Sequence, residues 1–212
     1  MPGSPLGRTL VIANPAARSG RGEDGARFAQ EFLQSYASAT RGFEVVRTQG
    51  PADATRIARG VRGFDTILAL GGDGVIHEVV CGLMALPREA RPQLGVIPLG
   101  SGNDYARTLG MARNDVEAAL AQLVRGRAHH VEVGRVNGTP FMQTLSFGLD
   151  AAIALDTTNR RAAGTSQEGE ALFATSALRI LSNAREGFPV RASFDGEKTQ
   201  DLSTIIFAVQ VL

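Results

Sequence analysis

The sequence predicts an α/β protein in which a Rossmann-like parallel sheet, over residues 1–127, is followed by a β-rich region over residues 128–212. Two observations lead to this fold class. In the first region, short apolar runs alternate with stretches of helical periodicity, as in a parallel sheet covered by helices on both faces. In the second region, apolar runs are joined by hairpin turns such as Asn137-Gly138. We therefore expect two domains.

Four strands and their connecting helices are predicted in the first region. Each strand candidate is a short apolar run that ends near glycine, proline or asparagine. The strands are expected at 9–13, 43–48, 67–70 and 94–98, and the helices at 24–38, 52–61, after Gly74, before 109 and at 116–124. If the strands are neighbours, the loops that follow the first, third and fourth strands share one edge of the sheet, where ligands of such folds bind.

A glycine turn that contains one aspartate follows the third strand. Gly71, Gly72 and Gly74 allow a ligand to lie directly on the main chain. The helix that begins there directs unpaired N–H groups and a partial positive charge to the same place, which suits a phosphate. Asp73 is positioned to hold Mg²⁺ between phosphate oxygens. The same residues could form a simple strand-to-helix turn, so this motif alone leaves both interpretations open.

Composition excludes several classes of protein. The net charge of +1 argues against a general nucleic-acid binder. Cys81 is the single cysteine, so no disulfide can form within the chain and a reducing cytoplasm is expected. No apolar run approaches the roughly 18 residues of a membrane span, and the N-terminus lacks the apolar core of a signal peptide. A soluble, cytoplasmic protein is predicted.

The second region is expected to contain two hairpins and one helix. Strands are predicted at 130–136 and 141–147, a mobile loop at 157–169, a helix at 170–184 and a second hairpin from 190–194 and 202–212. The sequence ends within an apolar strand, and natural chains rarely leave such an edge unprotected. We therefore expect a fragment of a longer chain, whose unpaired strand would favour pairing into a homodimer.

Several motifs occur together in one order along the chain. They are Asn14-Pro15, Ser19-Gly20, Gly71-Gly72-Asp73-Gly74 with Glu78, Pro98-Leu99-Gly100-Ser101-Gly102-Asn103-Asp104 and Ser146-Phe147-Gly148-Leu149-Asp150-Ala151. In this combination the sequence resembles the diacylglycerol kinase catalytic-domain family, and within it the soluble bacterial lipid kinases related to sphingosine and ceramide kinases.

The resemblance implies transfer of the γ-phosphate of ATP to the hydroxyl of diacylglycerol or a related lipid. It implies Mg²⁺, a cleft between the nucleotide domain and a β-sandwich domain, and peripheral action at the inner membrane face. Asp73 would be the catalytic and metal-binding acid. The nucleotide-binding residues that it implies are Asn14, Ser19, Gly20, Thr48, Gly71, Gly72, Asp73, Gly74, Val75, Ile76, His77 and Ser101. Arg18 and Arg21 are additional candidates for phosphate contact.

The sequence also departs from the family pattern. Val75 stands where threonine is usual, and His77 stands where asparagine is common. The general base of the family lies beyond the last residue of this sequence, so no base can be assigned here. Two alternatives remain open at this point. One is NAD kinase, which shares the Gly-Gly-Asp-Gly turn, and the other is a nucleotide-binding module without catalytic activity.

Overall fold

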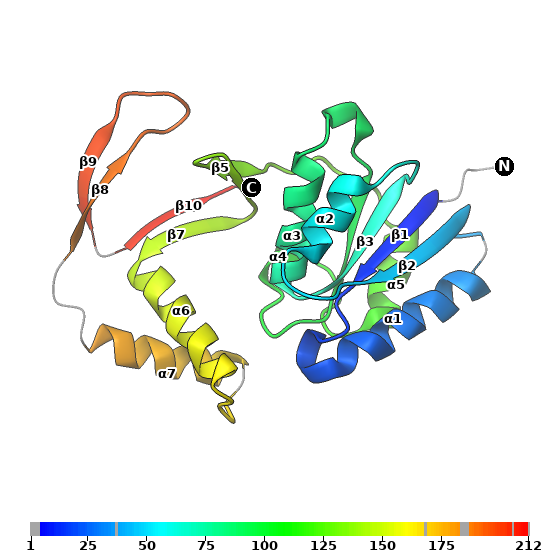
Figure 1. Ribbon diagram of the computed structural model, residues 1–212, viewed down its shortest axis with the longest axis horizontal. Coiled ribbons are helices and arrows are strands. Elements are labelled where there is room, and N and C mark those ends of the chain that lie inside the picture. Colours follow the sequence, from blue (N-terminus) through cyan, green and yellow to red (C-terminus); the bar gives the residue numbers. More distant parts are fainter. Residues whose placement is uncertain (1–4, 37, 168, 183–186, 205, 212) are drawn as a thin grey trace. The chain divides into compact units, whose positions relative to one another are not determined.

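A four-stranded parallel sheet organises the first of the two units into which the chain divides (Figure 1). The computed structural model describes residues 5–36, 38–167, 169–182, 187–204 and 206–211. The first unit extends to Met142 and the second is Gln143–Val211. Residue 168 of the predicted loop, residues 183 and 184 of the predicted helix and residues 205 and 212 of the predicted last strand lie outside the described residues.

The strands of the parallel sheet are the four predicted apolar runs, and their ends differ from the predicted ones by at most one residue. Their order in the sheet is β2-β1-β3-β4, and every neighbouring pair is parallel. This confirms the predicted α/β class and the neighbouring positions of the first, third and fourth strands. The strands are β1 (Arg8–Ala13), β2 (Gly42–Arg47), β3 (Thr66–Gly71) and β4 (Gln93–Pro98).

Helices cover both faces of the sheet, as alternation along the buried strands requires. Leu10 and Ile12 of β1 belong to the core on the side of α2 and α3, whereas Val11 and Ala13 belong to the core on the side of α1 and α5. The helical elements are α1 (Ala17–Ser35), α2 (Asp53–Gly60), α3 (Asp73–Met84), the 3₁₀ turn η1 (Arg88–Ala90), α4 (Asp104–Thr108) and α5 (Val116–Arg125).

A short hairpin completes the first unit. It joins β5 (Gly134–Val136) to β6 (Thr139–Phe141), and both turn residues, Asn137 and Gly138, have the positive φ values of the predicted turn. The strand predicted at 130–136 therefore forms only at its end. Because β6 packs against α3, the first unit extends beyond the domain boundary predicted after residue 127. The assignment of the two predicted domains to nucleotide and lipid stays a prediction.

The described residues of the second unit form two helices and two antiparallel strand pairs. The elements are β7 (Thr144–Gly148), α6 (Leu149–Ala162), α7 (Gly169–Leu181), β8 (Phe188–Ala192), β9 (Gln200–Thr204) and β10 (Ile206–Gln210). Strand β7 pairs with β10, and β8 pairs with β9. A β-rich second region is thus confirmed, whereas its membership of a β-sandwich stays a prediction.

The loop predicted at 157–169 is wrong over its first part, because α6 continues to Ala162. Leu149, Ile153 and Thr157 are buried at helical spacing. The hydroxyl of Thr157 donates to the carbonyl oxygen of Ile153 at 2.8 Å, so a polar side chain is accommodated in the buried face of the helix. The strand predicted at 141–147 is likewise divided between β6 and β7.

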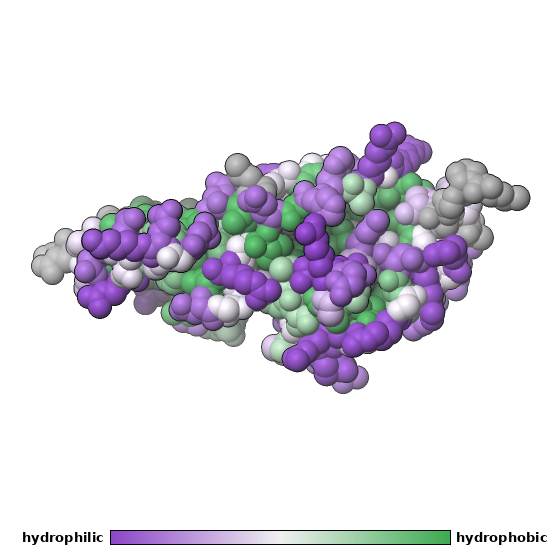
Figure 2. Space-filling view, turned by 90° about the horizontal axis from the view of Figure 1, so that it is seen from above, coloured by the Kyte–Doolittle hydropathy of each residue, from purple (hydrophilic) through white to green (hydrophobic). Residues whose placement is uncertain are grey.

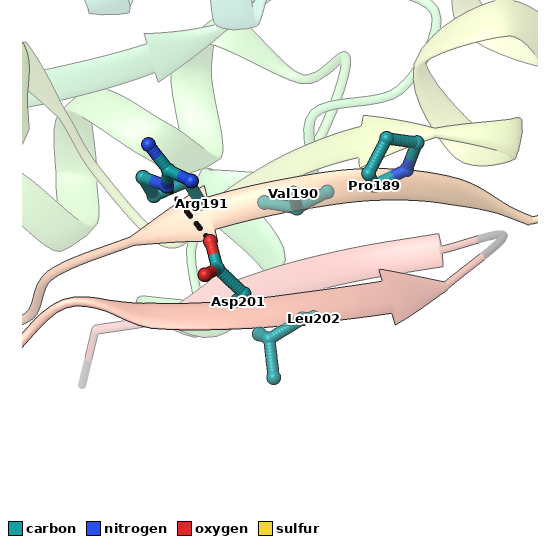
Figure 3. Close-up of a pocket in the computed structure, with 5 residues that line it drawn as sticks. All are labelled: Pro189, Val190, Arg191, Asp201 and Leu202. Atoms are coloured by element: carbon teal, nitrogen blue, oxygen red, sulfur yellow. Dashed lines mark hydrogen bonds and ion pairs between the residues drawn. The ribbon is translucent and has the colours of Figure 1, made fainter.

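On the face shown in Figure 2, hydrophilic residues predominate and apolar residues are visible between them. Along β8 and β9, a shallow hollow of about 350 Å³ is crossed by an ion pair between Arg191 and Asp201, whose atoms are 2.8 Å apart (Figure 3). Among the described residues, no helix has both the length and the apolar character needed to cross a bilayer.

Candidate nucleotide site

The loops that follow the four parallel strands are joined to one another at one edge of the sheet. The backbone N–H of Asn14 donates to a carbonyl of β3 at 2.9 Å, and that of Thr48 donates to a carbonyl of β1 at 2.8 Å. The N–H of Leu99, after β4, donates to the carbonyl of Gly71 at 2.8 Å. The shared edge that the sequence predicts is therefore confirmed, and it brings these loop starts together.

Helix α3 begins within the glycine turn, and no described side chain caps its N-terminus. The N–H groups of Val75 and Ile76 bond to the carbonyl of Gly72, whereas those of Asp73 and Gly74 precede the first turn of helical bonds. A Cβ atom added at Gly74 would have no neighbour within 4 Å. In the described part of the chain, the N–H groups of Asp73 and Gly74 have no main-chain partner, and the positive end of the helix dipole lies beside them. This arrangement fits a phosphate.

The glycine turn and the loop after β4 touch through their main chains. A Cβ atom at Gly100 would lie 2.5 Å from the Cα of Gly72, and one at Gly72 would lie 3.2 Å from the Cα of Gly100. A side chain at Gly100 would therefore force the two loops apart. The requirement for glycine at these two positions is a requirement of packing between loops, in addition to any contact with a ligand.

Asp73 connects the same two loops through its side chain. Its Oδ1 accepts a hydrogen bond from the N–H of Tyr105, at the start of α4, at 3.1 Å. Its Oδ2 lies 3.1 Å from the position of a Cβ added at Gly102. In the described part of the chain, no group of three or more His, Cys, Asp or Glu residues could hold a metal ion. The Oδ2 of Asp104 lies 3.2 Å from the same Cβ position. Mg²⁺ would therefore fit here with one or two carboxylates, together with phosphate oxygens.

Asn103 fixes the loop after β4, a role that the sequence reading did not assign. The side chain is buried and the residue adopts a left-handed conformation with φ of 55°. Its Oδ1 accepts from the N–H of Gly100 at 2.8 Å, and its Nδ2 donates to the carbonyl of Gly100 at 2.9 Å. An asparagine in a glycine-rich loop is the available signal, because asparagine tolerates this conformation. Ser101 is exposed on the loop that Asn103 closes.

The loop after β1 forms an arc, residues 16–21, in which every residue except Ala17 is exposed. The Oδ1 of Asn14 accepts from the N–H of Ala16 at 3.0 Å, and Arg18, Ser19 and Gly20 have positive φ values of 47°, 58° and 94°. These three residues interrupt the helical geometry at the start of α1, which explains why helical periodicity begins only near residue 24. Ser19 and Gly20 therefore lie on the surface at the predicted edge.

The comparison with protein families decides the assignment. The family model of the diacylglycerol kinase catalytic domain matches residues 8–136. The chain belongs to this family. The matched part includes the four parallel strands and all the loops of the candidate site, so the resemblance found in the motifs is confirmed.

Diacylglycerol kinase relatives match both the sequence and the fold. A protein named diacylglycerol kinase from Bacillus subtilis is 33% identical over 195 residues, which are 91% of this chain and 61% of that protein. A probable YegS-like lipid kinase from Chromohalobacter salexigens is 39% identical over 107 residues, which are 50% of this chain and 34% of that protein. A structure described as a putative diacylglycerol kinase from Bacillus anthracis has 26% identity and a TM-score of 0.70, covering 97% of this chain and 65% of that one.

Two residues of the family motif have side chains that point into protein contacts. Ile76 is fully buried in the core, so only its main chain can reach a ligand. His77 Nε2 lies 3.0 Å from the carbonyl oxygen of Pro140 in β6 and 3.5 Å from the sulfur of Cys81. Burial raises the pKa of the Cys81 thiol, with a smaller contribution from the charge of Glu78. A nucleotide contact of His77 stays a prediction.

Glu78, which the motif contains without an assigned role, holds the start of α2. Its Oε1 accepts from the N–H of Ala52 at 2.9 Å, and its Oε2 accepts from the N–H of Ala54 at 3.2 Å. The hydroxyl of Thr55 also donates to the Glu78 carbonyl at 2.9 Å. Helix α2 lacks a capping side chain of its own, so this diacylglycerol kinase family domain obtains the cap from α3. An alanine at the helix start was the only sequence signal.

Proposed function

We propose that this chain carries the nucleotide-binding part of an ATP-dependent lipid kinase. The reaction is transfer of the γ-phosphate of Mg-ATP to the hydroxyl of diacylglycerol or a related lipid, which is a step of phospholipid metabolism. The observation that supports ATP most directly is the open N-terminus of α3, which lies between the loops after β1 and β4. The names of the relatives support a lipid acceptor, and the chain spans 61% of the Bacillus subtilis relative.

The proposed roles follow from what phosphoryl transfer requires. Such reactions depend on positioning and on neutralisation of charge more than on covalent chemistry. Main-chain donors at the start of α3 would hold a phosphate, and the exposed cations Arg18 and Arg21 extend from the adjacent arc. Thr48, which is buried at the end of β2, would face the nucleoside side. Mg²⁺ held by Asp73 would neutralise phosphate charge.

The substitution Asp73→Asn separates two roles of this residue. Asparagine keeps an oxygen that can accept from the N–H of Tyr105, so the connection between the two loops is retained. It removes the negative charge that Mg²⁺ requires. We expect a loss of kcat/KM of at least 100-fold, or about 2.7 kcal/mol of transition-state stabilisation, with a melting temperature close to that of the unmodified protein.

The measurement is transfer of labelled γ-phosphate from Mg-ATP to diacylglycerol in mixed micelles. Asp24→Asn is the matched control, since Asp24 pairs with Arg27 on the surface of α1. Transfer that is retained in Asp73→Asn would limit Asp73 to its structural bond. Transfer to NAD instead of lipid would favour NAD kinase, and ATP binding without transfer would favour a non-catalytic module.

A further inference from the structure

The arc after β1 is fixed firmly at both ends, and between them it is held by the buried Ala17 and by one long bond of 3.4 Å from the N–H of Gly20 to the carbonyl of Ala16. At its beginning, Asn14 bonds to the N–H of Ala16 at 3.0 Å. At its end, Gly22 packs against the main chain, because a Cβ atom there would lie 1.9 Å from the carbonyl oxygen of Asn14. Between these points, Gly20 has a φ of 94° and no atom within 4 Å of an added Cβ. The exposed middle of the arc, from Arg18 to Gly20, thus depends largely on the two ends for its position.

An ion pair secures the second end of the arc to the sheet. Nε of Arg47 is 2.9 Å and 2.7 Å from the two carboxylate oxygens of Glu23, and Nη2 is 2.8 Å from Oε1. Arg47 is the last residue of β2, and Glu23 follows Gly22 directly in α1. The hydrogen bonds from Arg47 are the largest cause that lowers the pKa of Glu23. A two-pronged arrangement of this kind gives geometric specificity as well as attraction.

We propose that Glu23 and Arg47 act as positioning residues that hold the arc 16–21 ready for the phosphates of ATP. The inference rests on the proposed function, and neither residue is required to touch the nucleotide. Ordering a loop before binding removes part of the entropic cost of binding. Without the pair, the second end of the arc would be held only by the packing of Gly22, and each binding event would have to order Arg18, Ser19 and Gly20 to a greater extent.

The chain offers a matched control at the opposite end of the same strands. Arg8, at the start of β1, pairs with Glu44 of β2 through a contact of 3.2 Å. The side chains of both pairs are partly exposed, at 39% and 46% for Arg47 and Glu23 and at 52% and 57% for Arg8 and Glu44. The two pairs are similar in exposure, although Arg8 and Glu44 share one contact and Arg47 and Glu23 share three. The Arg8 pair therefore controls for the loss of an exposed ion pair that does not adjoin the arc.

The experiment combines limited trypsin digestion with Mg-ATP binding on the full chain. Arg18 and Arg21 are exposed and supply cleavage sites within the arc. We expect Glu23→Gln and Arg47→Gln each to increase cleavage after these arginines and to weaken Mg-ATP binding by about threefold to fivefold, the upper range for an exposed ion pair. The double variant should be no worse than either single variant, because both remove one interaction. Glu44→Gln should change neither measurement.

Two results would overturn the inference in distinguishable ways. If the unmodified chain binds Mg-ATP but Glu23→Gln and Arg47→Gln match Glu44→Gln in cleavage and affinity, the pair does not position the arc. Additive effects in the double variant would also show that the residues do not act as one unit. If the unmodified chain fails to bind Mg-ATP, and the nucleotide does not protect the arc from trypsin, the proposed function fails together with the inference.

Discussion

The two units bury their apolar side chains to different extents. In the first unit, a parallel sheet with helices on both faces supplies fully buried residues such as Leu68, Leu70 and Ile97. In the described part of the second unit, the buried apolar side chains are Leu149, Ile153 and Leu172. Its strands occur in pairs, and isolated two-stranded sheets are marginal in water. The first unit therefore contains most of the described core, and the candidate site is built on that core.

Helix α7 illustrates the difference. It buries Leu172 and Ser176 on one side, whereas Leu178 is 71% exposed and Leu181 is 51% exposed. Helices of the first unit expose mainly polar side chains opposite their buried faces, as amphipathic helices do. The second unit is thus held by fewer interactions, and five substitutions, used in three tests, can probe this comparison.

The largest difference between the two units is expected when one leucine in each is replaced by alanine. Leu68→Ala empties a fully buried position in β3 and should lower the free energy of unfolding by about 3 kcal/mol. Leu178→Ala removes an exposed side chain from α7 and should change it by less than about 0.5 kcal/mol. Urea unfolding followed by far-UV circular dichroism measures both. A loss above about 1 kcal/mol for Leu178→Ala would mean that this face is packed in solution.

A smaller effect is expected for carboxylates that make different contacts in the two units. Glu78→Gln places an amide donor against one of two backbone N–H groups and should cost about 1–2 kcal/mol. Asp201→Asn breaks a cross-strand ion pair whose side chains are 77% and 75% exposed, and should cost less than about 0.5 kcal/mol. Thermal unfolding of both variants makes the comparison. Equal losses would show that the exposed pair contributes more than its surroundings indicate.

The smallest effect concerns acid unfolding of the first unit. The N–H of Arg8, followed by the side chain of Arg41, lowers the pKa of Asp65 below its usual value near 3.8. A lowered folded-state pKa stabilises the protein above the unfolded pKa, and that contribution disappears as the pH falls through the folded value. Asp65→Asn should therefore reduce the loss of stability below about pH 4. Tyrosine fluorescence follows this unit, since Tyr36 and Tyr105 both lie in it and the chain lacks tryptophan. An unchanged pH profile would contradict the assigned bonds.

Much of the first unit could be predicted because its signals are local. The runs at β1, β3 and β4 are continuous and apolar, and glycine, proline or asparagine marks their ends. The second unit gave weaker signals. In α6, Thr157 and Thr158 disfavour a helix by propensity, yet tertiary burial of Thr157 overrides that preference. The misplaced loop at 157–169 follows from this conflict.

In the candidate site, the glycine turn could be predicted from the sequence, whereas the side chains that hold the neighbouring loop and helix in place could not. The glycines of the turn and Asp73 can be recognised in the sequence by residue type and spacing. The role of Asn103 depends on how its loop closes, and the role of Glu78 depends on a partner distant in sequence. A side chain that bonds to the backbone of another helix leaves little trace in the periodicity of its own helix. His77 shows the same limit, because its contact with Pro140 links positions 63 residues apart.

The central position of β1 in the sheet has a consequence for the order of synthesis. Strand β1 is made first, but its two neighbours are β2 and β3, which appear only after residues 42–47 and 66–71 have been made. Both hydrogen-bonding edges of β1 therefore stay unpaired until later parts of the chain have been made. Such long-range pairing slows folding and exposes strand edges to other chains. Ribosome-bound chains that end before residue 66 should depend on chaperones more than those that extend beyond β4.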